Sequence, residues 1–149
     1  MLRGRFTKFL LRNNSPDMLR IPQQIVDQLF SHAKTGLPEE VCGYLAGTDR
    51  DVAKHFQLTN IDHSNEHFSF DPAEQFQVMR EVRKEAQVIL ANYHSHPETP
   101  ARPSIEDIRL AYDPEISYVI ISLAAELPDI KSFRIRNGEV EKEEIQIVL

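Results

Sequence analysis

The stretch VILANYHSHPETPARPSIED, residues 88–107, contains the strongest signals for the fold of this chain and for its chemistry. Its first four residues are an apolar run that predicts a short central β-strand, and this run leads into His94-Ser95-His96. Side chains alternate along a strand, so the two histidines point to the same face of the sheet. Three prolines predict a loop over 97–103, and a short helix is expected over 104–112.

A carboxylate lies near the start of that short helix. Asp107 can close the third corner of a tetrahedron whose other corners are His94 and His96. Three protein ligands and one open position are typical of a catalytic zinc site, whereas a structural site has four protein ligands. Ser104-x-x-Asp107 also predicts a helix cap, with the serine at the N-cap and the acid three residues later. The two interpretations are compatible, because Asp107 can reach a metal ion from the first helical turn.

The composition is that of one ordinary globular domain. The chain has 149 residues, of which 41% are apolar and 27% are charged. The net charge of −6 argues against nucleic-acid binding, which needs clustered Lys and Arg. The single cysteine, Cys42, excludes an internal disulfide and fits a reducing compartment, so we expect a cytoplasmic protein. No apolar run is long enough to predict a membrane span. The basic residues 1–17 are expected to be a disordered extension, and 18–149 the folded domain.

Helical and strand patterns alternate along the rest of the chain. Apolar residues at helical spacing predict a helix over 23–35. Asp71-Pro72-Ala73-Glu74 is a strong helix start, and this helix is expected to run to about residue 86. Its predicted buried residues are Phe76, Met79, Val82 or the stem of Arg83, and Ala86. Strands are expected over 41–46, 52–58, 88–91, 117–123, 132–136 and 140–148, the last two forming a hairpin around Asn137-Gly138.

This arrangement indicates an α/β fold, or α+β by some schemes, with a mixed central sheet and flanking helices. The candidate ligands follow the carboxyl end of a central strand, a common position for sites in such sheets.

Two blocks of the sequence resemble the JAMM (MPN-plus) metalloprotease family. The first is the signature His94-x-His96-x7-Ser104-x-x-Asp107, which the family writes H-x-H-x7-S-x-x-D. The second, Glu40-Val41-Cys42-Gly43-Tyr44-Leu45-Ala46-Gly47, is similar to the family's first strand, E-x-C-G-x-L-x-G. The resemblance runs from about Ile21 to the C-terminus, and it implies an MPN-like, cytidine-deaminase-like sandwich. Among family members, the chain resembles the small bacterial single-domain type that acts on ubiquitin-like sulfur carriers.

The resemblance also implies roles for individual residues. His94, His96 and Asp107 would bind one Zn²⁺ per chain, Glu40 would be the general acid/base, and Ser104 would stabilise the oxyanion. Glu39 is the alternative candidate for the base, but Glu40 has the spacing to Cys42 and Gly43 that is found in the family pattern. The implied substrate is a ubiquitin-like β-grasp sulfur-carrier protein, cut at a peptide or isopeptide bond after its C-terminal glycines.

Other interpretations and other residues carry less weight. A non-catalytic scaffold of the same fold is the main alternative, although such relatives lack the metal ligands. A zinc deaminase would need a P-C-x-x-C pair, which a single cysteine cannot supply. A non-haem iron oxygenase also uses two histidines and a carboxylate, but its usual triad needs neither the serine nor the upstream glutamate.

The remaining histidines and the cysteine are expected to have no part in the chemistry. His63 and His67 are expected at the surface or in a substrate groove, and His32 and His55 are expected to be structural or exposed. Cys42 is expected to be a buried small apolar residue. Asn92 and the loop Glu98–Arg102 are expected to line the rim of the site.

Overall fold

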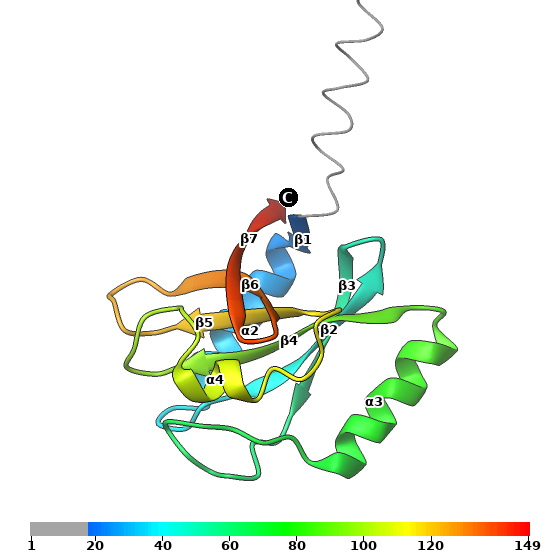
Figure 1. The fold of residues 1–149 in the computed structure, drawn as a ribbon. Helices are drawn as coiled ribbons and strands as arrows, with labels where there is room; N and C mark the ends of the chain where they lie inside the picture. The colour runs from blue at the N-terminus through cyan, green and yellow to red at the C-terminus, as the bar shows by residue number, and fades with distance from the viewer. Residues whose placement is uncertain (1–17) are drawn as a thin grey trace, which may run out of the picture.

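The computed structural model describes residues 18–149, so the expectation for residues 1–17 lies outside the described part of the chain. Figure 1 shows a strongly curved mixed sheet with helices packed around it. The elements are β1 (Met18–Pro22), α2 (Gln23–Thr35), β2 (Cys42–Thr48), β3 (Asp51–Leu58), α3 (Pro72–Lys84), β4 (Val88–His96), α4 (Ile105–Arg109), β5 (Ser117–Ser122), β6 (Asp129–Arg136) and β7 (Glu139–Val148). The predicted α/β class, with a mixed sheet and flanking helices, is confirmed. Among the described residues, no helix has the length and apolar character needed to cross a membrane.

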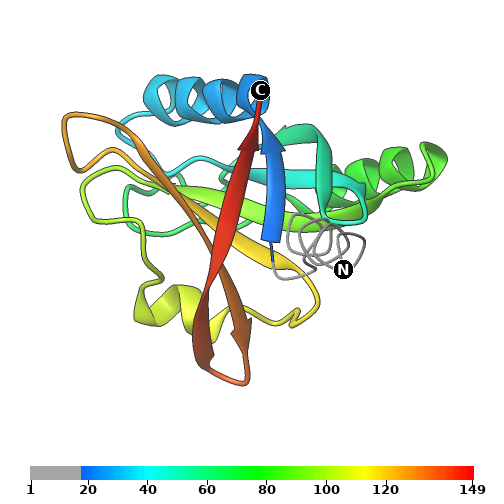
Figure 2. The ribbon, with the colours of Figure 1, turned by 90° about the horizontal axis from the view of Figure 1, so that it is seen from above.

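The strands form a closed ring in the order β1-β3-β2-β4-β5-β6-β7. β4 lies in the middle, antiparallel to β2 and parallel to β5. The ring closes because β1 runs parallel to β7, from Met18 opposite Glu144 to Pro22 opposite Val148 (Figure 2). β1 was not predicted, because five residues before a helix are too few for alternation to be recognised. Leu19 and Ile21 nevertheless alternate with partly buried neighbours and are fully buried.

Helix α2 is confirmed at its predicted bounds. Its apolar stripe is buried against the sheet, with Ile25, Val26, Leu29 and Ala33 all under 7% exposed. On this side of the sheet the stripe meets Tyr93 of β4 and Val119 and Ile121 of β5.

Helix α4 packs against the opposite face of the same strands. Tyr118 and Ile120 of β5 alternate with Val119 and Ile121, and they pack with Ile108 of α4 instead. Figure 2 shows α2 and α4 on opposite sides of the sheet. Because Tyr93 faces α2, its neighbour His94 faces α4.

Helix α3 begins as predicted but buries a different face. Asp71 is its N-cap, and the carboxylate accepts a hydrogen bond from the Ala73 amide at 2.9 Å. The predicted burial of Phe76 and Met79 is wrong, since these side chains are 68% and 47% exposed. Val82, one of the two predicted alternatives, is buried as expected, and Val78 is buried with it, against Tyr44 and Leu58 of the sheet. Both pairs have helical spacing, so the sequence pattern alone does not select between the two faces.

The end of α3 also differs from the prediction. The helix stops at Lys84, and Ala86, which we expected to be buried, is exposed beyond it with φ of 55°. Arg83 is also exposed. The chain therefore turns away from the helix axis before β4 begins.

Other boundaries shifted by only a few residues. β4 extends through both histidines rather than ending before them, and α4 is shorter than its predicted range. The β6–β7 hairpin is confirmed, with Asn137 and Gly138 at φ of 53° and 79°, the left-handed conformations of a type I′ turn.

A buried carboxylate joins several strands of the ring. Glu143 of β7 is 5% exposed and accepts hydrogen bonds from Arg50 Nη2 at 2.6 Å, Ser117 Oγ at 2.6 Å and Ser132 Oγ at 2.7 Å. These donors come from the β2–β3 turn, β5 and β6. The buried charge is therefore both paired and hydrogen-bonded, as burial of a carboxylate requires.

Candidate metal centre

Strand β4 fixes the direction of the two histidines through the side chains of their neighbours in the strand. The Tyr93 hydroxyl lies 2.9 Å from His32 Nδ1 on the α2 side of the sheet. Ser95 is also fully buried, and its Oγ accepts a hydrogen bond from the Val41 amide at 2.8 Å. Because neighbouring strand residues face opposite sides, anchoring Tyr93 and Ser95 directs His94 and His96 to the other face.

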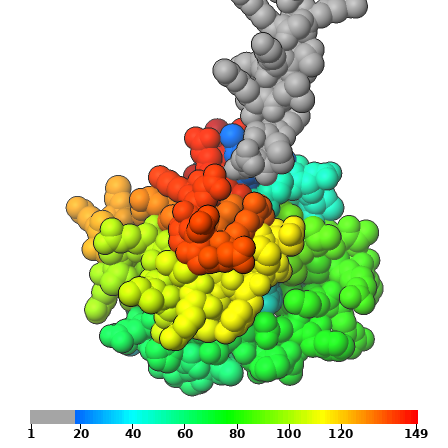
Figure 3. Space-filling view, viewed as in Figure 1, coloured from blue at the N-terminus to red at the C-terminus, as the bar shows by residue number. Residues whose placement is uncertain are grey.

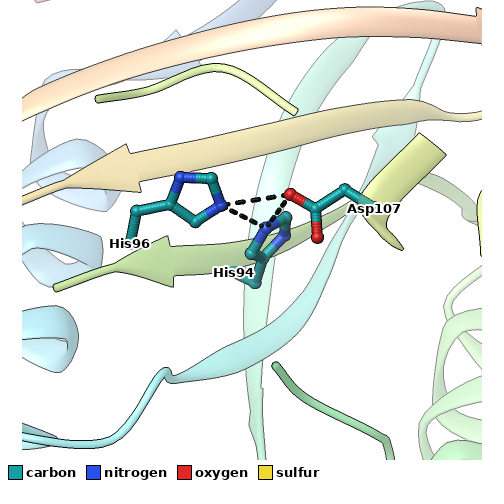
Figure 4. Close-up of side chains that lie close together, drawn as sticks. All are labelled: His94, His96 and Asp107. Atoms are coloured by element: carbon teal, nitrogen blue, oxygen red, sulfur yellow. Dashed lines mark hydrogen bonds and ion pairs between the residues drawn. The ribbon is translucent and has the colours of Figure 1, made fainter. Parts of the chain in front are cut away.

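Helix α4 brings the carboxylate to this face. Ser104 caps the helix: its Oγ accepts from the Asp107 amide at 3.0 Å, and its own amide donates to Asp107 Oδ2 at 2.9 Å. Asp107 Oδ2 lies 3.1 Å from both His94 Nε2 and His96 Nε2, and the two nitrogens are 3.1 Å apart (Figure 4). The structure thus brings together the three residues predicted as metal ligands. The helix cap and the approach of Asp107 to the histidines coexist.

The protonation of these groups fits a divalent cation. His96 Nδ1 lies 2.9 Å from the Pro100 carbonyl oxygen, which can only accept, so Nδ1 carries the hydrogen and Nε2 presents a lone pair. Burial lowers the pKa of His94 and favours its neutral form. His94 Nε2, His96 Nε2 and the carboxylate oxygen of Asp107 thus converge, and the last two face each other with lone pairs. Such an arrangement needs a proton or a cation between them, and it is a donor set that zinc accepts.

Without a cation, the surroundings of His96 shift its pKa toward the charged form. Burial opposes its charged form, but the contact with Asp107 and the bond to the Pro100 carbonyl outweigh burial and raise the pKa of His96. Burial also opposes the charged form of Asp107, yet the contacts with His94 and His96 lower the pKa of that carboxyl well below its usual range. Asp107 is therefore ionised at neutral pH, as a metal ligand must be.

Glu40 is a buried carboxyl close to this cluster. The residue is 4% exposed, and its Oε1 has no hydrogen-bond partner among the described residues. Burial, with smaller contributions from Asp107 and Glu106, raises the pKa of Glu40 to about 8, while His96 acts in the opposite direction. By contrast, the Glu39 side chain is 41% exposed, and its carboxylate lies 3.5 Å from His63 Nδ1.

The backbone around Glu40 is held by residues that the sequence did not single out. The Glu40 amide donates to the Ser64 carbonyl at 2.8 Å, and Asn60 Nδ2 donates to the Glu40 carbonyl at 3.0 Å. Asn60 also donates to the His67 carbonyl at 3.1 Å and accepts from the Ser69 amide. An asparagine in an irregular segment gives no strong sequence signal, so only the tertiary structure shows that Asn60 ties the 60–70 loop to Glu40.

The remaining predicted residues are placed as follows. Cys42 is fully buried, which confirms that prediction, and burial raises the pKa of its thiol to about 12. His67 Nδ1 lies 2.9 Å from Asp62 Oδ2 at the surface. Asn92 lines a cavity beside the centre, whereas the 98–102 loop reaches the centre through the Pro100 carbonyl.

That cavity has a volume of about 270 Å³ and opens next to His94 and Asp107. Most of its lining is apolar. The residues come from the loop before α3, from α4 and the segment after it, and from β5 and β6: Phe68, Phe70, Leu110, Tyr112, Tyr118, Ile120 and Ile135. Figure 3 shows the surface of this region, with α4 lying between the β6–β7 hairpin and the loop before α3.

Comparison with known proteins gives a consistent result. Residues 22–136 match the family model described as prokaryotic homologs of the JAB domain. The chain is 34% identical over 143 residues to the CysO-cysteine peptidase of Mycobacterium tuberculosis, covering 93% of this chain and 97% of that protein. It is 32% identical over 103 residues to the desampylase of Haloferax volcanii, covering 64% and 74% of the two chains. It is also 32% identical over 95 residues to a probable TtuB-protein conjugate cleaving protease of Thermus thermophilus, covering 63% and 64%.

Solved structures agree on the fold. A solution structure of a Desulfitobacterium hafniense protein superposes with a TM-score of 0.81 at 46% identity, covering 88% of this chain and 93% of that one. The JAB1/MPN domain protein of Archaeoglobus fulgidus superposes with a TM-score of 0.59 at 20% identity, covering 86% and 97%. The expected MPN-like fold is confirmed.

Proposed function

Because the chain belongs to the prokaryotic JAB family of JAMM-type peptidases, we propose that it is a zinc-dependent hydrolase acting on a ubiquitin-like sulfur carrier. In this proposal the enzyme cuts the peptide or isopeptide bond that follows the carrier's C-terminal glycines. The names of the relatives support this substrate class, since they describe a peptidase for CysO-cysteine and a protease for TtuB conjugates. A cytoplasmic location remains a prediction.

The observation that carries the proposal is the convergence of His94, His96 and Asp107 beside a buried carboxyl. His94 Nε2, His96 Nε2 and Asp107 Oδ2 would hold the zinc ion. When bound at such a site, zinc lowers the pKa of water toward about 7 and polarises carbonyl groups. A purely structural role would not require an unpaired buried carboxyl next to the ligands. We therefore favour catalysis over the non-catalytic scaffold.

Glu40 is the proposed general acid/base. In the metal-free protein, burial raises its pKa to about 8, which brings proton uptake and release by this carboxyl toward neutral pH. The unpaired Oε1 is free to accept the proton of an attacking water molecule and to return it to the leaving amine. Glu39 is exposed and paired with His63, so it is the weaker candidate.

Ser104 is the proposed oxyanion donor. Its Oγ already accepts a hydrogen bond from the Asp107 amide, and among the described residues its hydroxyl hydrogen has no acceptor. That hydrogen can be donated to the carbonyl oxygen of the bond being cut. Loss of one such donor typically costs about 10²- to 10³-fold in rate.

The test uses sulfur carriers with extensions. CysO and TtuB would be prepared with a C-terminal Gly-Gly followed by a short peptide and incubated with the zinc-loaded protein, and cleavage would be followed by mass spectrometry. We expect a cut after the second glycine, loss of activity in Glu40→Gln with metal retained, and near-normal activity in the matched control Glu39→Gln. If no carrier is cut, the substrate assignment is wrong; wild-type cleavage by Glu40→Gln would remove Glu40 from the mechanism.

A further inference from the structure

We propose that the apolar cavity beside the candidate metal centre binds the side chain of the first residue after the cut bond, and that it selects a large apolar residue there. The inference rests on the proposed function, in which the two residues before the cut are glycines. Glycines have no side chains to occupy a cavity next to the reacting atoms. The group removed is therefore the part of the substrate that can fill it.

The position of the cavity is the first support. His94 and Asp107 belong both to its lining and to the ligand cluster, so the cavity is continuous with the centre. Glu106 lies on its wall, and the charge of Glu106 also acts on the Glu40 carboxyl. A residue whose amine is released next to Glu40 thus has the cavity within reach of its side chain.

One wall of the cavity is built in advance from stacked rings. Phe68 stacks on His94 with ring centroids 4.6 Å apart, and Phe70 meets Phe68 edge-on at 5.4 Å. Tyr44 of β2 in turn stacks on Phe70 at 4.8 Å, and its hydroxyl accepts a hydrogen bond from Gln75 of α3 at 2.8 Å. The wall is therefore tied to β2 and α3, and little order has to be imposed on it when a side chain enters.

The floor and rim determine the chemistry of the occupant. Ile120 and Ile135, each 1% exposed, form the apolar floor of the cavity. Leu110 and Tyr112 lie at its rim and are 41% and 81% exposed. A cavity of about 150 Å³ lined by such residues is enough to hold benzene, so about 270 Å³ accepts a phenylalanine or leucine side chain. The carboxylate of Glu106 disfavours an acidic residue.

Cleavage rates give the first test. A carrier ending in Gly-Gly would carry one appended residue, Phe, Leu, Ala or Asp, each amidated at its C-terminus. Burial of a large apolar side chain predicts kcat/KM values roughly 10- to 100-fold higher for Phe and Leu than for Ala, with Asp lowest. Equal rates for all four fusions would overturn the cavity proposal while leaving the proposed function intact.

Two tryptophan variants test whether the preference for a large apolar residue comes from this cavity. Leu110→Trp narrows the rim and should lower the Phe-to-Ala ratio of kcat/KM about tenfold or more. Leu127→Trp is the matched control, because Leu127 is 78% exposed and does not line the cavity. An unchanged ratio in Leu110→Trp, or an equal fall in Leu127→Trp, contradicts the proposal.

Methyl NMR tests occupancy without turnover. Titration of the zinc-loaded protein with phenylalaninamide should shift the methyl signals of Leu110, Ile120 and Ile135 at concentrations where alaninamide does not. Shifts confined to residues outside the cavity would overturn the proposal. If no fusion were cut, the proposed function would fail, and this titration alone would decide whether the cavity binds a large apolar group.

Discussion

Replacing Glu40 by glutamine is expected to stabilise the metal-free protein at alkaline pH while abolishing its activity. The reason is the environment of the carboxyl group, which is 4% exposed and has an oxygen without a hydrogen-bond partner among the described residues. Burial is the main cause that raises its pKa from 4.5 to about 8. An ionised Glu40 is therefore a cost to folding that a neutral glutamine of the same shape does not carry.

The pH window follows from the direction of this shift. Between pH 4.5 and about 8 the folded protein keeps a proton on Glu40 that the unfolded chain releases, so stability is present at acid pH and is lost as pH rises. Each pH unit in this window lowers the free energy of unfolding by about 1.4 kcal/mol, which gives an upper limit of about 5 kcal/mol. Relaxation and hydration around the new charge reduce the cost, and we expect about 2–3 kcal/mol.

Urea unfolding of chelator-treated protein at pH 5, 7 and 9 measures this difference. Wild type and Glu40→Gln should have similar stability at pH 5, and the variant should be the more stable by about 2–3 kcal/mol at pH 9. The histidines titrate in both proteins, so their contribution to the difference is limited to the coupling between His96 and Glu40. Glu39→Gln should follow the wild type, because the Glu39 side chain is 41% exposed. A wild-type-to-Glu40→Gln difference that is constant from pH 5 to pH 9 would refute the argument that Glu40 is a buried carboxyl of raised pKa.

Three further predictions concern the centre and its support. Dialysis against a chelator should abolish cleavage, and added zinc should restore it. Elemental analysis of the restored protein should give one zinc ion per chain. Activity that survives complete metal removal would contradict the mechanism. Ser104→Ala should lower kcat about 10²- to 10³-fold and cost about 1 kcal/mol of stability through the lost cap, whereas Ser104→Thr keeps the hydroxyl and should retain most of both. Glu143→Ala should destabilise the fold by roughly 3–5 kcal/mol in urea unfolding, because it leaves the Arg50 guanidinium, whose side chain is only 16% exposed, without its carboxylate. A loss below about 1 kcal/mol would show that the cluster is not needed.

Local signals in the sequence were sufficient for several elements. The apolar stripe of 23–35 has helical period and matches α2 at both ends. Asp71 and Pro72 predict the start of α3, because a side-chain acceptor and a residue without an amide hydrogen satisfy the first turn. Asn137-Gly138 predicts a tight hairpin, because both residues tolerate positive φ. The spacing of His94 and His96 likewise predicts a shared face, since strand side chains alternate.

Other features were decided by contacts between segments far apart in the chain. The buried face of α3 was one of these: the pairs Phe76/Met79 and Val78/Val82 both have helical spacing, and only contact with the sheet shows that Val78 joins the predicted Val82 in the core while Phe76 and Met79 stay exposed. The closure of the ring is another, because β1 is short and its partner β7 lies at the opposite end of the sequence.

At the candidate centre the same division holds. The residue types and the spacing of His94, His96 and Asp107 are enough to indicate a metal site, because ligand chemistry depends on side-chain identity. Only the tertiary structure shows that Glu40 is buried while the Glu39 side chain is 41% exposed, with Asn60 of the 60–70 loop donating to the Glu40 carbonyl. The cavity next to His94 is assembled from β5, β6, α4 and that same loop. Burial, and with it the pKa of a carboxyl group and the shape of a cavity, is a property of all the surrounding segments together, and no single stretch of sequence contains it.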